Sequence, residues 1–190
     1  MRIGFVSTRF HGTDGVSLEA SKWAKVFEEE LDHECFWFAG KLDTPDDSSS
    51  LCPEAFFEHP SVIPLQENLF SNLSTCSNDL TDSVNALEGV IRNSLEDFVR
   101  EYAIDLIIPQ NVLAIPMHVP MGLAVTNMAS EGLPMIAHHH DFYWERERFL
   151  KGCAQHYLDS SFPPKLTEKF QHVVINSQAK ESLMQRLGLE

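Results

Sequence analysis

The fold of this chain is decided by residues 3–40, which read IGFVSTRFHGTDGVSLEASKWAKVFEEELDHECFWFAG. Residues 3–6 are a short apolar run, typical of a strand that is buried on both faces. A loop with two glycines follows, and from Val16 to Leu31 apolar side chains recur every three or four residues, which predicts a helix. The aromatic-rich residues 35–39 predict a second strand. Strand, glycine loop, helix and strand in this order form a right-handed βαβ unit.

The same alternation continues along the chain. Further strands are expected at residues 105–109, 135–137 and 172–176, and further helices at 84–102 with Thr81 or Asp82 as N-cap, between Pro120 and Gly132, and from Ser177 as N-cap to Gly188. Residues 41–64 are rich in Ser, Asp and Pro and predict an excursion from the sheet edge. The predicted fold is therefore α/β, a Rossmann-like open and mostly parallel sheet with helices on both faces.

Composition excludes several classes of protein. The chain has 190 residues, 43% hydrophobic and 22% charged, and a formal net charge of −14, which repels nucleic-acid phosphates and anionic lipids. No apolar run is long enough for a membrane helix, and the first residues lack the features of a signal peptide. The four cysteines, Cys35, Cys52, Cys76 and Cys153, form no CxxC pair, and we expect them to be buried thiols in a cytoplasmic protein.

In open parallel sheets, ligands bind beyond the carboxyl ends of the strands, so the residues that follow each strand are candidates for a site. The first such cluster is His11-Gly12-Thr13-Asp14-Gly15, whose glycines allow backbone amides to approach an anion at the start of a helix. Its spacing is neither the dinucleotide fingerprint GxGxxG nor a P-loop. A tight turn without a ligand explains this loop equally well.

The second cluster is residues 137–145, AHHHDFYWE, at the end of a strand. Because side chains alternate along a strand, His138 and His140 share one face and His139 takes the other, which opposes a metal site made of all three. His140 beside Asp141 is instead a polar or proton-handling pair, and Trp144 is a stacking wall for a ring-shaped ligand. Ordinary hydrogen-bonded histidines remain the alternative.

The third cluster is Asn176-Ser177, where a capping side chain and free helix amides could face the same crevice, although helix capping alone accounts for it. Arg146 and Arg148 follow Trp144 and would either meet an anionic substrate or simply solvate a loop.

Four segments together resemble the N-terminal half of the retaining glycosyltransferases of family 4, which have the GT-B fold. They are RIGFVS at 2–7, TDGVSLE at 13–19, HHDFYW at 139–144 and VINS at 174–177, and they occur in order over nearly the whole chain. The resemblance implies that the glycine loop lies near the acceptor and the donor phosphate, and that the histidine of the His-Asp pair lines the transfer site.

Carried onto this chain, the resemblance assigns these roles to Gly12, Asp14, Gly15 and His140, with Asp141 and Trp144 beside them. We predict His140 and Asp141 as catalytic residues, and Gly12, Asp14, Gly15, His139, Trp144 and Asn176 as substrate-binding residues. The family's second domain, which carries the donor-nucleotide motif, would follow Ser177, whereas this sequence ends at Glu190. Residues 1–190 are therefore expected to form one acceptor-side domain that lacks its donor-binding partner.

The predicted function is transfer of a hexosyl group from a nucleotide sugar to a small-molecule or glycan acceptor, with retention of configuration and without a metal or other cofactor. Catalysis would be mainly positional and electrostatic. One alternative is a non-catalytic module that binds an anion or a sugar phosphate. Another is a metal-dependent hydrolase built on His138, His140 and Asp141.

Overall fold

The computed structural model, which describes residues 1–166 and 168–188, contains one six-stranded sheet in the order β3-β2-β1-β4-β5-β6. All five strand pairs are parallel, which confirms the predicted α/β class. The order reverses between β1 and β4, where the chain leaves one half of the sheet for the other. Such a switch point opens a crevice at the carboxyl ends of the two strands.

The strands are β1 (Arg2–Val6), β2 (Glu34–Ala39), β3 (Ser49–Leu51), β4 (Leu106–Pro109), β5 (Met135–His139) and β6 (Phe170–Val174). The α-helices are α1 (Gly15–Glu29), α2 (Ile63–Leu69), α3 (Asn78–Glu101), α4 (Val119–Ser130), α5 (Gln155–Ser161) and α6 (Ser177–Leu187). Short 3₁₀ turns occur at η1 (Asp46–Ser48), η2 (Pro53–Ala55), η3 (Tyr143–Glu145) and η4 (Glu147–Phe149). No helix in the described part of the chain is both long and apolar enough to cross a bilayer.

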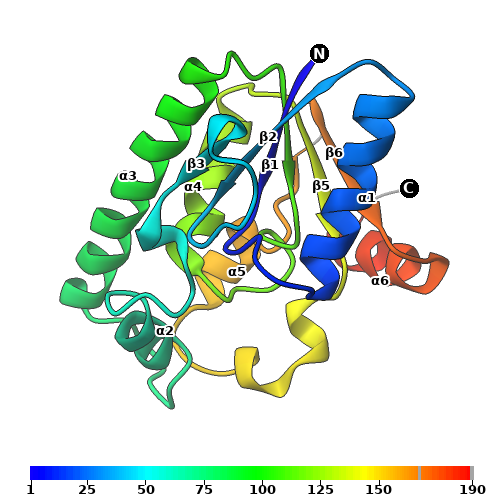
Figure 1. Cartoon of the computed structure of the whole chain (residues 1–190). Helices are drawn as coiled ribbons and strands as arrows, with labels where there is room; N and C mark the ends of the chain where they lie inside the picture. The colour runs from blue at the N-terminus through cyan, green and yellow to red at the C-terminus, as the bar shows by residue number, and fades with distance from the viewer. Residues whose placement is uncertain (167, 189–190) are drawn as a thin grey trace.

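Helices cover both faces of the sheet, as predicted, because strand side chains alternate between two cores. Ile3 and Phe5 of β1 pack under α1, in a core that includes Ala20 and Trp37. The opposite core is larger and holds the buried side chains of α3 and α4. Figure 1 shows α1 and α3 on opposite sides of the sheet.

Several element boundaries differ from the prediction. Helix α3 begins one turn earlier than expected, because the Ser77 hydroxyl and not Thr81 or Asp82 accepts the hydrogen bond from Leu80 N. Helix α6 is capped by Asn176, whose Oδ1 accepts from Ala179 N, and not by Ser177.

The sheet edge and two helices also depart from the sequence reading. Within the excursion of residues 41–64, β3 adds a strand to the sheet, and the short helices α2 and α5 were not predicted. The apolar spacing predicted a helix as far as Leu31, but α1 ends at Glu29 and Leu31 is 51% exposed. Three-residue strands and seven-residue helices are too short to produce a clear periodic signal.

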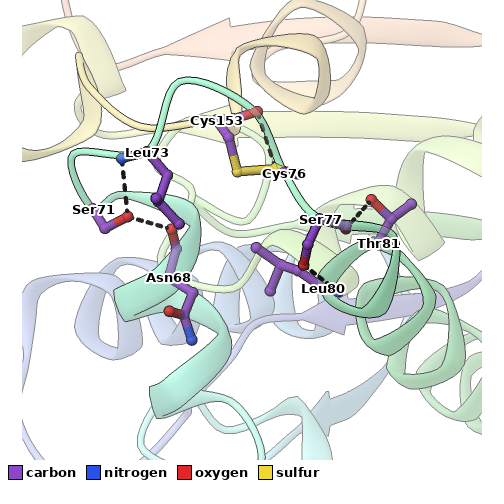
Figure 2. The surroundings of a disulfide bond; sticks show 8 residues. All are labelled: Asn68, Ser71, Leu73, Cys76, Ser77, Leu80, Thr81 and Cys153. Atoms are coloured by element: carbon purple, nitrogen blue, oxygen red, sulfur yellow. Dashed lines mark hydrogen bonds between the residues drawn. A yellow bond between two sulfur atoms is a disulfide. The ribbon is translucent and has the colours of Figure 1, made fainter.

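Two of the four cysteines are joined, so the prediction of buried thiols is wrong for Cys76 and Cys153 and confirmed for Cys35 and Cys52. The bond spans 77 residues and ties the loop between α2 and α3 to the segment before α5 (Figure 2). On one side it lies next to the capping Ser77, and on the other Cys153 N donates to Leu69 O at 3.0 Å. Disulfides are rare in the reducing cytosol outside hyperthermophiles, so the cytoplasmic location stays a prediction.

Candidate active site

A cleft of about 360 Å³ opens at the switch point of the sheet. We call it the switch-point cleft. It is lined by residues 7–9 and 14–16 after β1, by Phe57, by residues 110–112, 115, 117 and 118 after β4, and by residues 140, 141, 146 and 148 after β5. The lining thus comes from the carboxyl ends of three parallel strands, where ligands bind in folds of this type.

Gln110 organises the floor of this cleft. It directly follows β4 and is 1% exposed, and its Oε1 lies 2.9 Å from His138 Nδ1 and 3.2 Å from His140 Nε2. One carboxamide oxygen can accept both hydrogen bonds only if each ring carries its proton on the nitrogen that faces it. The Nε2 atom of Gln110 is buried and has no hydrogen-bond partner among the described residues.

Both imidazole rings on Gln110 are held neutral. Burial and, to a smaller extent, the nearby His140 ring lower the pKa of His138 to about 4, although Glu19 opposes the shift. Burial also lowers the pKa of His140, although Glu19, Asp141 and Asp14 oppose the shift. A neutral His140 with its proton on Nε2 keeps Nδ1 unprotonated, so the ring can accept a hydrogen bond from a hydroxyl group.

Asp141 is held as an oriented anion by residues from two segments. Asn111 Nδ2 donates to Asp141 Oδ1 at 2.9 Å, and Arg146 Nε donates to Asp141 Oδ2 at 2.9 Å. Asn111 also accepts from His140 N at 3.0 Å, and its φ of 60° lies in the left-handed region, which Asn tolerates better than most residues. The His-Asp pair is therefore fixed by the loop that follows β4.

Asp14 of the glycine loop binds the free backbone amides at the start of α1. Asp14 caps α1, because its carboxylate accepts from Val16 N, Ser17 N and the Ser17 hydroxyl. These hydrogen bonds and the charge of Arg9 hold the pKa of Asp14 below its usual value, although burial acts in the opposite direction and is the largest single influence. The two amides at the start of the helix, which were expected to bind an anionic ligand, are already occupied.

Four of the eight predicted site residues line the switch-point cleft: Asp14, Gly15, His140 and Asp141. The other four lie outside it. Gly12 is exposed and donates its N–H to Asp43 Oδ2 at 2.7 Å, and Asn176 is exposed at the cap of α6.

His139 and Trp144 lie outside the cleft, the first buried and the second half-buried against other side chains. His139 is 1% exposed on the opposite face of the sheet, as the alternation predicted, with its Nε2 2.8 Å from His172 Nδ1. Trp144 stacks on Phe142 and donates its indole N–H to Ser182 of α6, so it supports a helix and forms no wall of the cleft.

Sequence reasoning missed Gln110, Asn111, His118 and Arg9, which all line the cleft. Gln110 and Asn111 stand directly after a predicted strand, and that position was the signal that could have identified them. His118 is a structural residue: its Nδ1 accepts from Met121 N at the start of α4, and its Nε2 donates to Glu54 O at 2.8 Å.

The described residues do not include a group of three or more His, Cys, Asp or Glu placed to hold a metal ion. His138 and His140 both turn a nitrogen toward Gln110, and Asp141 is engaged by Asn111 and Arg146. The arrangement therefore suits recognition of hydroxyl and anionic groups, and it does not favour the metal-dependent hydrolase.

Two curated proteins are similar to this chain along its whole length. The mannosylglucosylglycerate synthase of Thermotoga maritima is 30% identical over 194 residues, and the mannosylglucosylglycerate synthase of Petrotoga mobilis is 33% identical over 196 residues. Both alignments cover 100% of this chain and 43% of the relative. No protein-family profile matches the sequence, and no solved structure matches it significantly.

Proposed function

We propose that this chain is the acceptor-side domain of a glycosyltransferase that transfers a hexosyl group from a nucleotide sugar. The observation that carries the proposal is the similarity of the whole chain to two mannosylglucosylglycerate synthases, of which it spans 43%. The switch-point cleft and the resemblance to retaining glycosyltransferases of family 4 support it. The name of the relatives describes a mannosyl group on glucosylglycerate, so mannosyl transfer to glucosylglycerate is the reaction we propose.

In this reaction the bond between the sugar and the nucleotide phosphate breaks, and the acceptor oxygen forms the new glycosidic bond. The proton of the acceptor hydroxyl leaves with the departing phosphate. The chain's own groups position the reactants: the neutral His140, which lines the cleft and is held by Gln110, accepts a hydrogen bond from a sugar hydroxyl. The fixed carboxylate of Asp141 favours the positive charge that develops on the transferred sugar. No step requires a metal ion or a covalent intermediate.

Residues 1–190 form the acceptor side, and a donor-binding domain elsewhere in the intact protein completes the site. We propose that the configuration of the sugar is retained and that the reaction takes place in the cytoplasm.

The test uses the intact protein with a nucleotide-linked mannose and glucosylglycerate. We expect mannosylglucosylglycerate by mass spectrometry, with the donor's anomeric configuration by NMR. His140→Ala should lower kcat by about 100-fold or more, within the range of a lost positioning or proton-handling group. His156→Ala on the exposed surface of α5 is the matched control and should leave kcat unchanged. Binding of the nucleotide sugar without any transfer would favour the non-catalytic module.

A further inference from the structure

The switch-point cleft is positively charged in an acidic protein. Its lining contains three arginines, Arg9, Arg146 and Arg148, and two carboxylates, Asp14 and Asp141, so its formal charge is +1. The whole chain has only 14 Lys and Arg and a net charge of −14. Three arginines in one cleft of such a chain create a local field that attracts anions.

Both carboxylates of the cleft are already paired, and two of the arginines are paired with them. Asp14 caps α1 and lies 3.4 Å from the Arg9 guanidinium, and Asp141 is bound by Asn111 and Arg146. These ion pairs orient Arg9 and Arg146 and use part of their charge.

Arg148 differs from the other two. Within residues 1–166 and 168–188 it forms no ion pair. Its Nη2 lies 3.0 Å from Met117 Sδ, and its Cζ lies 4.6 Å from the centre of the Phe149 ring. A thioether is a weak acceptor and an aromatic face accepts no planar hydrogen-bond pair, so these contacts hold the side chain and leave most guanidinium N–H groups free.

We propose that Arg148, with Arg146 beside it, binds a carboxylate on the acceptor substrate and selects acidic acceptors over neutral ones. A guanidinium binds a carboxylate through two parallel hydrogen bonds, which fixes both the position and the orientation of the acceptor. The amides of Val16 and Ser17 at the start of α1 are occupied by Asp14, so they do not compete with the arginines for the carboxylate. This inference rests on the proposed function, because it names the class of acceptor used at the same site.

The test compares two acceptors on the intact enzyme: glucosylglycerate, which is acidic, and glucosylglycerol, in which a neutral hydroxymethyl group replaces the carboxylate. Arg148→Met should raise KM for glucosylglycerate by about 10-fold or more, the effect of losing a charged hydrogen bond. The same variant should change KM for glucosylglycerol and for the nucleotide sugar by less than 2-fold. Arg148→Lys should keep part of the preference, because it keeps the charge and loses the planar pair.

Arg100→Met is the matched control, because it removes one charge from an exposed site on α3 outside the cleft. It should alter neither KM. An equal effect of Arg148→Met on both acceptors would overturn the proposal, and a selective rise in KM for the donor would assign the arginine to the donor diphosphate instead. Calorimetric binding of glucosylglycerate separates the two hypotheses: binding that depends on Arg148 without any transfer rejects the proposed function alone, and transfer without dependence on Arg148 rejects this inference alone.

Discussion

Asn111 and Asp141 are 30 residues apart in the sequence, and Asn111 Nδ2 donates a hydrogen bond to Asp141 Oδ1 at 2.9 Å. The bond joins the loop after β4 to the loop after β5 and holds the carboxylate at the edge of the cleft. Asn111 makes this bond from a left-handed backbone, with a φ of 60°.

Replacing Asn111 should therefore affect both stability and activity. Asn111→Ala removes the hydrogen bonds to Asp141 and His140 and places a methyl group in a left-handed backbone, so the free energy of unfolding should fall by about 2 to 4 kcal/mol. Asn111→Gly should lose about 1 kcal/mol less, because glycine adopts this conformation freely. Both variants should transfer sugar slowly, since Asp141 loses its orientation.

The measurements are urea unfolding and steady-state kinetics. Asn72→Ala is the control, because Asn72 is exposed and is not among the residues that line the cleft. This variant should match the parent protein in stability and in activity. If Asn111→Ala were as stable and as active as that control, the bond to Asp141 would have no role.

The disulfide should contribute strongly to stability. Closing a loop of 77 residues restricts the unfolded chain, so the double variant Cys76→Ser/Cys153→Ser should lose about 4 kcal/mol of unfolding free energy. The parent protein should lose a similar amount when a reductant is added, and the double variant should lose nothing further. Cys35→Ala keeps the disulfide and should remain sensitive to the reductant. An equal stability of parent and double variant under oxidising conditions would contradict the expectation.

Stability should decrease as the pH falls from about 6.5 to about 4. Burial lowers the pKa of His118, His138 and His172 to about 4, whereas the unfolded chain titrates these groups near 6.5. Between these values the unfolded state binds more protons than the folded state, so protonation favours unfolding. Each histidine adds a slope of up to about 1.4 kcal/mol per pH unit.

His118→Asn provides the check on that pH dependence. Asparagine can still cap α4, but it does not titrate and it loses the hydrogen bond to Glu54 O. The variant should be less stable at pH 7.5 and show a shallower decline of the unfolding free energy toward pH 4. An unchanged slope would mean that the His118 ring is already protonated in the folded state or titrates normally.

The two loop glycines should respond differently to alanine. Gly12 has a φ of 77°, so Gly12→Ala should cost about 1 kcal/mol of stability and leave KM unchanged, because residue 12 lies outside the cleft. Gly15 begins α1 with no atom within 4 Å of an added Cβ, so Gly15→Ala should be as stable as the parent. Because Gly15 lines the cleft, the methyl group of the alanine would take up room in it, and KM for glucosylglycerate or for the nucleotide sugar should rise. Thermal unfolding and kinetics of the two variants distinguish these outcomes, and a stability loss at Gly15 with unchanged KM would reject its place in the site.

The sequence by itself determined the order of the five longer strands and the four longer helices, and the division of the three histidines between two faces. Both are local properties: apolar side chains at spacings of two or of three to four residues specify which face of an element is buried, whatever the rest of the chain does. Residues 3–40 therefore indicated the βαβ unit, and the alternation in 137–140 correctly separated His139 from His138 and His140.

Only the tertiary structure decided which side chains meet. The order of β4 between β1 and β5 brings Gln110 onto two histidines and Asn111 onto Asp141, and the course of two loops brings Cys76 to Cys153. The hydrogen bond from the Trp144 indole N–H to Ser182 of α6 likewise joins segments that are 38 residues apart. Such pairings follow from the packing of elements that are distant in sequence, and a local periodicity carries no information about them.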